Sequence, residues 1–511
     1  MLSVIVAIDQ GTSGTRCLIV DEEGRPVSWA YRELRQIYPR PGWVEHDPLE
    51  ILDSARLVVS EALSNLKDDY RVEAVGVTNQ RETTVVWDRR TGAPVYNAIV
   101  WQDTRTAGRC EELRRMGLEE DPIHRLTGLY ASTYFSSTKA EWILQNVAGA
   151  AEMAKNGELL FGNIDTWLIW NMTRASGREA HVTDYTNASR TMLFDINRLE
   201  WSRELLEIFN IPESMLPEAL PSSFREHYGY TDLWGLLGRK VPVCGDLGDQ
   251  QAALVGQTCF GIGDAKNTYG TGCFLVQNIG EIPAISRHGL LTTVGYSVER
   301  GKAIYAMEGS VAIAGSLLRW LAENLSIISS PRESEALARS VAHEGSAGVY
   351  FVPAFSGLFA PHWDQTARGL IIGLSGYTRR EHIVHAALES ICWQTYDVVE
   401  AIEADTGVRL NILRVDGGAS QNNYLMQLQA DILGCEVVRP RYIETTSIGA
   451  AYFAGLAAGV WHSFSDLKRM WVPEANFTPT WSEERRRNGL RAWRAAVERA
   501  RGWLGASGQA G

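Results

Sequence analysis

Both halves of the 511-residue chain contain the same short pattern, in which an apolar run, a Gly-Thr turn and a second apolar run follow one another. The first copy is IVAIDQGTSGTRCLIV (5–20), and the second is AKNTYGTGCFLVQN (265–278). Apolar runs around a glycine-rich turn are typical of β-hairpins. The repeat therefore favours two domains built on one hairpin-first plan, which we place at residues 1–253 and 254–511.

Strands and helices alternate along both halves. Asp47-Pro48 is a helix-start signal that precedes apolar residues at helical spacing. Residues 379–405 have the pattern of a long amphipathic helix that ends at Gly407. The apolar segment 449–461 is too short to cross a bilayer, which takes roughly 20 residues, and is predicted to be a buried helix. This alternation predicts an α/β protein with a partly parallel sheet.

The composition excludes several classes of protein. Lys and Arg number 49 against 61 Asp and Glu, a net charge of −12, which has the wrong sign for binding a nucleic-acid backbone. The seven cysteines form no CxxC pair, so neither a zinc site nor a disulfide framework is expected, and a reducing cytoplasm fits best. The first residues resemble a buried strand rather than a signal peptide. We therefore expect a cytoplasmic enzyme without membrane insertion or a nucleic-acid partner.

Four turns combine glycine with acidic or hydroxyl-bearing residues at the ends of apolar runs. They are DQGTSGTR (9–16), GDLGDQQ (245–251), GTG (270–272) and DGGASQN (416–422). Glycine lets backbone N–H groups approach a phosphate, hydroxyls add donors, and a carboxylate at the end of a strand can hold Mg²⁺. One such turn is usually structural, but four in one α/β chain predict a nucleotide site. The chain contains no Walker-type loop, G-x-S-x-G or H-E-x-x-H motif.

At these residues the sequence resembles the FGGY carbohydrate kinase family, and within it the kinases that act on glycerol. The resemblance extends from the first strand to about residue 480. It is carried by DQGTSGTR (9–16), TNQRET (78–83), WQDTRT (101–106), YFSSTK (134–139), HVTDYTNASRTMLFD (181–195), GDQQAA (248–253), YGTGCF (269–274), VPAFSGL (352–358) and RVDGGASQNN (414–423).

The resemblance implies a fold of two actin-like, ribonuclease H-like ATPase domains with the active site in the cleft between them. It implies transfer of a phosphoryl group from ATP, with Mg²⁺, to glycerol, which yields sn-glycerol 3-phosphate. A homodimer or homotetramer is expected.

Matching motifs also imply the residues that handle glycerol. A small triol needs hydrogen-bonding groups at fixed positions and an apolar surface for its C–H face, and a site built in this way rejects analogues that lack a hydroxyl. Asp249 is the implied general base, which accepts the proton of the attacking hydroxyl. The implied glycerol contacts are Arg81, Glu82, Trp101, Tyr134, Asp249, Gln250 and Phe274.

A second set of matching residues is implied to bind the nucleotide and the metal ion. Asp9 and Asp249 are the implied Mg²⁺-facing carboxylates; Asp246 is either a further one or structural. Arg319 departs from the glutamine usual at its position, which leaves that nucleotide contact open; the alternative partners of an Arg here are a phosphate or a surface carboxylate. We expect Lys139 to have a structural role, and a helix to begin at Gly418 after a strand. The implied nucleotide contacts are Thr12, Ser13, Gly14, Arg16, Thr271, Gly315, Arg319, Gly418 and Asn422.

Two other functions remain open from the residues. The first is a kinase of the same family that acts on erythritol, ribulose or xylulose, although the TNQRET block and Trp101 favour a three-carbon substrate. The second is an actin-like or chaperone-like ATPase, which would not need Arg81, Glu82, Trp101 and Tyr134 together. Segment 228–242 lacks a Gly/Arg loop for fructose 1,6-bisphosphate, so that feedback control is not predicted.

Overall fold

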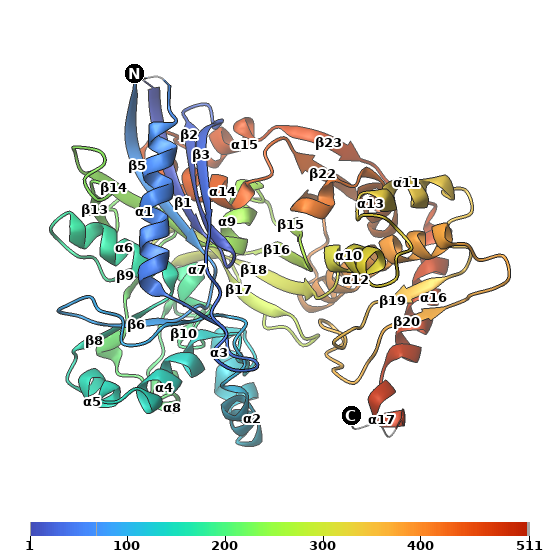
Figure 1. Cartoon of the computed structure of the whole chain (residues 1–511), viewed down its shortest axis with the longest axis horizontal. Coiled ribbons are helices and arrows are strands. Elements are labelled where there is room, and N and C mark those ends of the chain that lie inside the picture. The colour runs from blue at the N-terminus through green and yellow to red at the C-terminus, as the bar shows by residue number, and fades with distance from the viewer. Residues whose placement is uncertain (1, 68, 508–511) are drawn as a thin grey trace.

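A computed structural model describes residues 2–67 and 69–507. The first half of the chain contains a six-stranded sheet in the order β13-β14-β5-β1-β2-β3 (Figure 1). Strands β1, β5 and β14 are parallel, while β2 and β3 are antiparallel to their neighbours. The strands are β1 (Leu2–Gln10), β2 (Gly14–Asp21), β3 (Pro26–Glu33), β5 (Tyr70–Asn79), β13 (Gly229–Thr231) and β14 (Val241–Gly248).

The second half contains a seven-stranded sheet with the same central order and directions. Its strands β18-β16-β15-β21-β22 match β3-β2-β1-β5-β14 of the first sheet, taken in that order. Each neighbouring pair is antiparallel or parallel in the second sheet as the matching pair is in the first. The predicted duplication of a hairpin-first plan is therefore present in the topology. The strands are β15 (Asp264–Tyr269), β16 (Cys273–Gly280), β17 (Leu291–Glu299), β18 (Lys302–Val311), β21 (Ile412–Asp416), β22 (Glu436–Pro440) and β23 (Pro473–Phe477).

Helices α9 (Asp249–Gly256) and α14 (Thr445–Ala458) lie between the two sheets (Figure 1). Alternate residues of β1 face opposite sides of the first sheet. Ile5 and Ala7 share an apolar cluster with α9 and α14, whereas Val4, Val6 and Ile8 pack toward α1 (Pro48–Ser64). A Cβ at Gly256 or Gly449 would collide with the backbone of the facing helix. These glycines therefore allow α9 and α14 to pack closely, which brings the two sheets together.

Other helices cover the outer faces of the two sheets. In the first half these are α1 (Pro48–Ser64) and α6 (Ile164–Ala175); in the second they are α12 (Arg380–Thr406) and α13 (Asn423–Leu433). An attached region of the first half contains a further cluster of helices and short strands (Figure 1). It includes β6 (Val85–Asp88), β7 (Ala98–Ile99), α2 (Ala107–Arg115), α4 (Ser136–Asn146), α5 (Ala150–Lys155), β8 (Leu159–Gly162) and α8 (Arg203–Ile208).

Several local predictions are confirmed. The side chain of Asp47 caps α1 by accepting the N–H of Leu49 at 2.9 Å. The long helix ends at Gly407 in the left-handed conformation, and the segment predicted as a buried helix forms α14. Within the described residues, no helix is long and apolar enough to cross a membrane.

One helix start was predicted incorrectly. A helix was expected to begin at Gly418, but residues Gly418–Gln421 form a single 3₁₀ turn, η3, and α13 begins at Asn423. Asn422 caps α13 by accepting the N–H of Leu425 at 2.9 Å. The asparagine cap therefore determines where this helix begins.

Candidate active site

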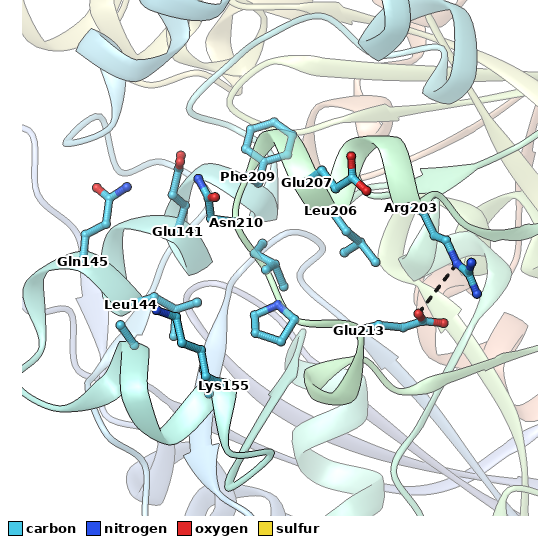
Figure 2. Close-up of a pocket in the computed structure, with 14 residues that line it drawn as sticks. Glu141, Leu144, Gln145, Lys155, Arg203, Leu206, Glu207, Phe209, Asn210 and Glu213 are labelled. Atoms are coloured by element: carbon cyan, nitrogen blue, oxygen red, sulfur yellow. Dashed lines mark ion pairs between the residues drawn. The ribbon is translucent and has the colours of Figure 1, made fainter.

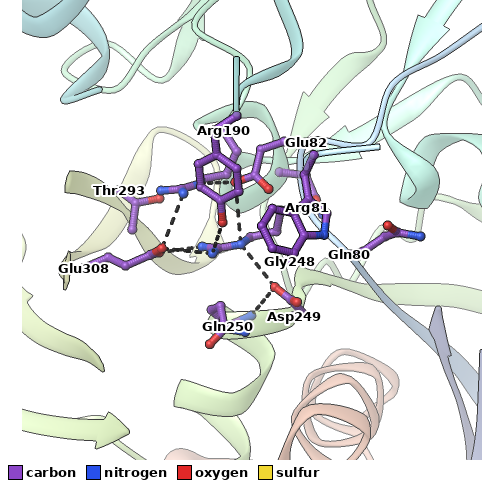
Figure 3. Close-up of polar contacts among 12 residues, drawn as sticks. Gln80, Arg81, Glu82, Arg190, Gly248, Asp249, Gln250, Thr293 and Glu308 are labelled. Atoms are coloured by element: carbon purple, nitrogen blue, oxygen red, sulfur yellow. Dashed lines mark hydrogen bonds and ion pairs between the residues drawn. The ribbon is translucent and has the colours of Figure 1, made fainter. Parts of the chain in front are cut away.

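Arg81 lies at the centre of a buried network of charged side chains (Figure 3). It follows β5, at the carboxyl end of the parallel strands of the first sheet. Its guanidinium donates to both carboxylate oxygens of Glu308 on β18, at 2.6 Å and 3.0 Å. Its Nε lies 3.1 Å from Oδ1 of Asp249. Arg81 therefore connects a carboxylate of the second sheet with the predicted general base.

Glu82 and Arg190 form a second buried ion pair beside Arg81. Oε1 of Glu82 accepts a hydrogen bond from Nε of Arg190 at 2.7 Å. Glu82 has a φ of 63°, a conformation that is uncommon for residues other than glycine. Burial raises the pKa of Glu82, and the two arginines counteract this only in part. Backbone strain and shifted pKa values are concentrated at functional sites, which favours a functional role for this segment.

Glu308 is held in its charged form. Burial acts to raise its pKa, but Arg190 and Arg81 outweigh burial and hold the pKa at about 2. Burial likewise disfavours a charged Arg81, yet Glu308 and the other neighbours raise the pKa of Arg81 well above its usual value. Each charge in this network is therefore stabilised by a partner of opposite sign.

Asp249 is the first residue of α9, and its side chain is 30% exposed. Oδ1 accepts the backbone N–H of Gln250 at 2.7 Å in addition to its contact with Arg81. The carboxylate is thus oriented by two donors while part of it remains open to a substrate. Such an arrangement suits a general base, because the acceptor must be reachable by the proton that it removes.

Two aromatic side chains lie next to the charged network. The rings of Trp101 and Tyr134 pack edge to face with their centroids 5.4 Å apart. The phenol oxygen of Tyr134 accepts a hydrogen bond from Nη2 of Arg81 at 3.3 Å. Nε1 of Trp101 donates to Oγ1 of Thr12 at 2.8 Å. The predicted glycerol wall therefore contacts both Arg81 and the β1–β2 turn.

Gln250 of α9 and Phe274 of β16 are joined by one lysine. Nζ of Lys266 on β15 contacts Oε1 of Gln250 and donates to the backbone carbonyl of Phe274 at 3.2 Å. The Phe274 side chain is half-buried on β16. Through these contacts the seven predicted glycerol residues are brought into one continuous group.

A cavity of about 820 Å³ collects the predicted nucleotide contacts of the second half. The β15–β16 turn, α10 (Gly315–Glu323), α11 (Glu333–Ser340) with the residues before it, and η3 supply its walls. Its size is in the usual range for small-molecule sites. The predicted contacts that line it are Thr271, Gly315, Arg319, Gly418 and Asn422.

Four predicted phosphate contacts lie outside this cavity, in the β1–β2 hairpin: Thr12, Ser13, Gly14 and Arg16. The N–H of Gly11 donates to the carbonyl of Gly14 at 2.9 Å, just as that of Gly270 donates to Gly272 at 2.9 Å. Both hairpin turns are thus closed by a backbone hydrogen bond between glycines, and the first turn is one residue longer than the second. Arg16 lies 3.5 Å from Glu444, at the start of α14.

The residues predicted to face Mg²⁺ fit that ion chemically. Burial raises the pKa of Asp9 to about 6; Ser447, which donates to its Oδ2 at 3.0 Å, opposes this, and the charge of Asp249 adds to it. A divalent cation would relieve this desolvation and repulsion. Within the described residues no three His, Cys, Asp or Glu side chains form a metal cluster. Mg²⁺ commonly takes only one or two carboxylates, with water and phosphate oxygens as its other ligands.

Asp246, the third carboxylate considered for Mg²⁺, lies in a different environment from Asp9 and Asp249. Asp246 is fully buried on β14, and the charges of Asp165 and Asp184 add to burial in raising its pKa. This environment favours a structural role for Asp246 over a role as a metal ligand.

A groove of about 720 Å³ between α4, α5, α8 and the segment after α8 (Figure 2) contains none of the predicted site residues.

Comparisons with known proteins identify the family of this chain. The N-terminal domain of the FGGY family of carbohydrate kinases matches residues 4–256, and its C-terminal domain matches residues 265–458. The chain belongs to the FGGY family of carbohydrate kinases. Within the family, it is 53% identical to a glycerol kinase of Caldanaerobacter subterraneus over 507 residues, which cover 98% of this chain and 99% of that protein. A glycerol kinase of Clostridium botulinum is also 53% identical, over 504 residues.

Two solved kinase structures share the whole fold. A Plasmodium falciparum glycerol kinase, solved with ADP, superposes with a TM-score of 0.93 at 40% identity and covers 98% of both chains. A xylulose kinase of Lactobacillus acidophilus has a TM-score of 0.86 at 20% identity and covers 99% of both chains, a likeness that concerns the fold alone.

Sequence reasoning did not identify four charged residues of this FGGY kinase site. Glu308, Arg190 and Lys266 contact predicted glycerol residues, and Arg332 lines the same cavity as Arg319. Lys266 lies in the second repeated hairpin and Arg190 in the HVTDYTNASRTMLFD block, so both carried a signal. Glu308 and Arg332 belong to no recognised motif and are placed only by the tertiary fold.

Proposed function

We propose that this FGGY kinase transfers the γ-phosphoryl group of ATP to glycerol, forming sn-glycerol 3-phosphate and ADP. The observation that carries the proposal is the convergence of Arg81, Trp101 and Tyr134 beside Asp249, whose carboxylate is oriented but partly open. The 53% identity to glycerol kinases over nearly the whole chain supports the choice of glycerol.

Asp249 acts as the general base in this mechanism. A primary hydroxyl of glycerol attacks the γ-phosphorus, the bond from that phosphorus to the bridging oxygen of ADP breaks, and Asp249 accepts the hydroxyl proton. Arg81 orients the base through its Nε, at 3.1 Å. Phosphoryl transfer depends mainly on positioning and electrostatics, so a carboxylate of ordinary basicity suffices.

The remaining site residues bind and orient the two substrates. Arg81 and Glu82 pair with glycerol hydroxyls, Gln250 adds a further hydrogen bond, and Trp101, Tyr134 and Phe274 cover the carbon chain. The nucleotide occupies the cavity lined by Thr271, Gly315, Arg319, Gly418 and Asn422, and its phosphates reach the hairpin that contains Thr12, Ser13, Gly14 and Arg16. Bound Mg²⁺, held by Asp9 and Asp249, would neutralise phosphate charge.

We further propose that the chain divides into domains 1–253 and 254–511, works in the cytoplasm and forms a homodimer or homotetramer. The matching sheet topologies of the two halves support the division. Light scattering coupled to size-exclusion chromatography measures the assembly directly, and a monomeric mass would contradict it.

A coupled ADP-release screen tests the substrate. Glycerol, dihydroxyacetone, erythritol and xylulose are compared at equal concentrations with saturating Mg-ATP. The proposal predicts the highest kcat/KM with glycerol. Faster turnover of erythritol or xylulose, with only background release on glycerol, would overturn it.

A further inference from the structure

Lys266 is a fully buried lysine in the central strand of the second sheet. Its Nζ contacts Oε1 of Gln250, and donates to Oγ1 of Thr268 at 3.1 Å and to the carbonyl of Phe274 at 3.2 Å. An ammonium group has three N–H donors, and here each has an acceptor. All three acceptors are uncharged, so the amine is not buried as half of a hydrogen-bonded ion pair.

The charges around Lys266 come from several elements. Burial lowers its pKa to about 8; Asp416 of β21, Asp249 of α9 and Glu308 of β18 act to raise it, and Arg81 acts to lower it. A buried amine without a hydrogen-bonded carboxylate is a costly way to stabilise a core, and an apolar side chain of similar size would often serve as well. The contacts of this lysine instead connect α9 with the β15–β16 hairpin.

The contact with Gln250 fixes the orientation of a carboxamide. A carboxamide carries an acceptor oxygen and a donor N–H₂ group, and either can face a ligand depending on which way the group is turned. Lys266 has only donors, so it can bind Oε1 but not Nε2. Within the described residues Nε2 has no hydrogen-bond partner, which leaves its two N–H groups free.

We propose that Lys266 is a positioning residue for the acceptor substrate. This inference rests on the proposed function. By holding Oε1 of Gln250, it makes Gln250 a hydrogen-bond donor to a hydroxyl oxygen of glycerol. By holding the Phe274 carbonyl, the same ammonium places the aromatic wall of β16 against that substrate. Lys266 itself does not touch glycerol.

Steady-state kinetics of Lys266→Met test the proposal. Loss of a hydrogen bond from a charged group weakens binding by about 10- to 100-fold, so the glycerol KM should rise by about that factor. The ATP KM should stay within about twofold of the parent value, and kcat should change much less than the glycerol KM. Lys302→Met is the matched control, because Lys302 is an exposed lysine on β18 of the same sheet. An unchanged glycerol KM, or a loss confined to the ATP KM or kcat, would overturn the proposal.

A double-mutant cycle with Gln250→Ala shows whether Lys266 acts through Gln250. In the Gln250→Ala background the added Lys266→Met change should raise the glycerol KM by less than about threefold, since coupled residues are not additive. Fully multiplicative effects would contradict the proposal. Should Lys266→Met fail to fold, Lys266→Leu, which also lacks a donor, replaces it in the same cycle.

The parent enzyme separates this inference from the proposed function. Absence of glycerol turnover by the parent would overturn the function and the inference together. Normal parent turnover with a normal glycerol KM in the Lys266 variants would overturn the inference alone.

Discussion

Arg81 and Glu308 are 227 residues apart in the sequence and form a two-point ion pair, with N–O distances of 2.6 Å and 3.0 Å. Arg81 follows β5 of the first sheet, and Glu308 lies on β18 of the second. The same guanidinium orients Asp249 through its Nε. A residue of the second half thus helps to set the position of the proposed general base in the first half.

Replacing Glu308 should change how stability depends on pH. The ionised form of Glu308 contributes stability above its unfolded pKa of roughly 4.5, and this contribution is lost as the pH falls toward the folded pKa of about 2. Glu308→Gln should therefore lower the free energy of unfolding by roughly 3–5 kcal/mol near neutral pH, because two buried arginines lose a charged partner. The difference in unfolding free energy between the parent and Glu308→Gln should become smaller below pH about 4.5.

Urea titrations between pH 3 and 8 measure this difference. Glu299→Gln is a matched control, because Glu299 lies on the adjacent strand but is exposed and paired with Lys302. A Glu308→Gln penalty that stays constant to the lowest pH would show that the ion pair is not the source of the stability.

Asp249→Asn removes the base while keeping the shape of the side chain. Its kcat with glycerol should fall by about 10²- to 10⁴-fold, and the KM values for glycerol and ATP should change by only a few-fold. Arg81 retains Glu308, so the melting temperature should change little. Asp53→Asn, at an exposed position of α1, is the control. Parent-like kcat in Asp249→Asn would remove Asp249 from the mechanism.

Two glycines that line the nucleotide cavity should respond differently to alanine. A Cβ at Gly315 would lie 2.5 Å from the carbonyl oxygen of Gly270, so Gly315→Ala should displace the β15–β16 turn and lower both the melting temperature and ATP affinity. A Cβ at Gly418 meets nothing within 4 Å. Gly418→Ala should raise the ATP KM without lowering the melting temperature, because its methyl takes space from the ligand. Equal losses of stability in both variants would contradict this geometry.

Arg319 should contribute to nucleotide binding through its charge. It lines the cavity and is exposed, and within the described residues its guanidinium has no hydrogen-bond or ion-pair partner. Arg319→Ala should raise the ATP KM by about three- to tenfold, with a smaller effect at high salt because exposed charges are screened. Arg409→Ala is the control, since Arg409 is an exposed arginine that pairs with Glu403, and neither residue lines the cavity. An unchanged ATP KM in Arg319→Ala would show that the guanidinium does not contribute to ATP binding.

Sequence patterns predicted the features that depend on neighbouring residues. The Gly11–Gly14 and Gly270–Gly272 turns and the end of α12 at Gly407 follow from local backbone preferences. A helix was expected from Gly418, but the side chain of Asn422 caps α13, which begins at Asn423.

Contacts between distant segments were not predictable in this way. Glu308 belongs to an ordinary strand, and only the pairing of β18 with β16 brings it to Arg81. Lys139 was expected to be structural, and its ammonium donates to the backbone carbonyls of Tyr134 and Phe135 at 2.6 Å and 2.9 Å. The motifs thus indicated which segments to examine, while tertiary packing determined which side chains meet.

The stoichiometry of the products tests the central claim most directly. The enzyme is incubated with Mg-ATP and limiting glycerol, and ADP and sn-glycerol 3-phosphate are measured in the same samples. We predict one sn-glycerol 3-phosphate for each ADP until the glycerol is consumed. ADP formed without phosphorylated glycerol would contradict this account and favour an ATPase.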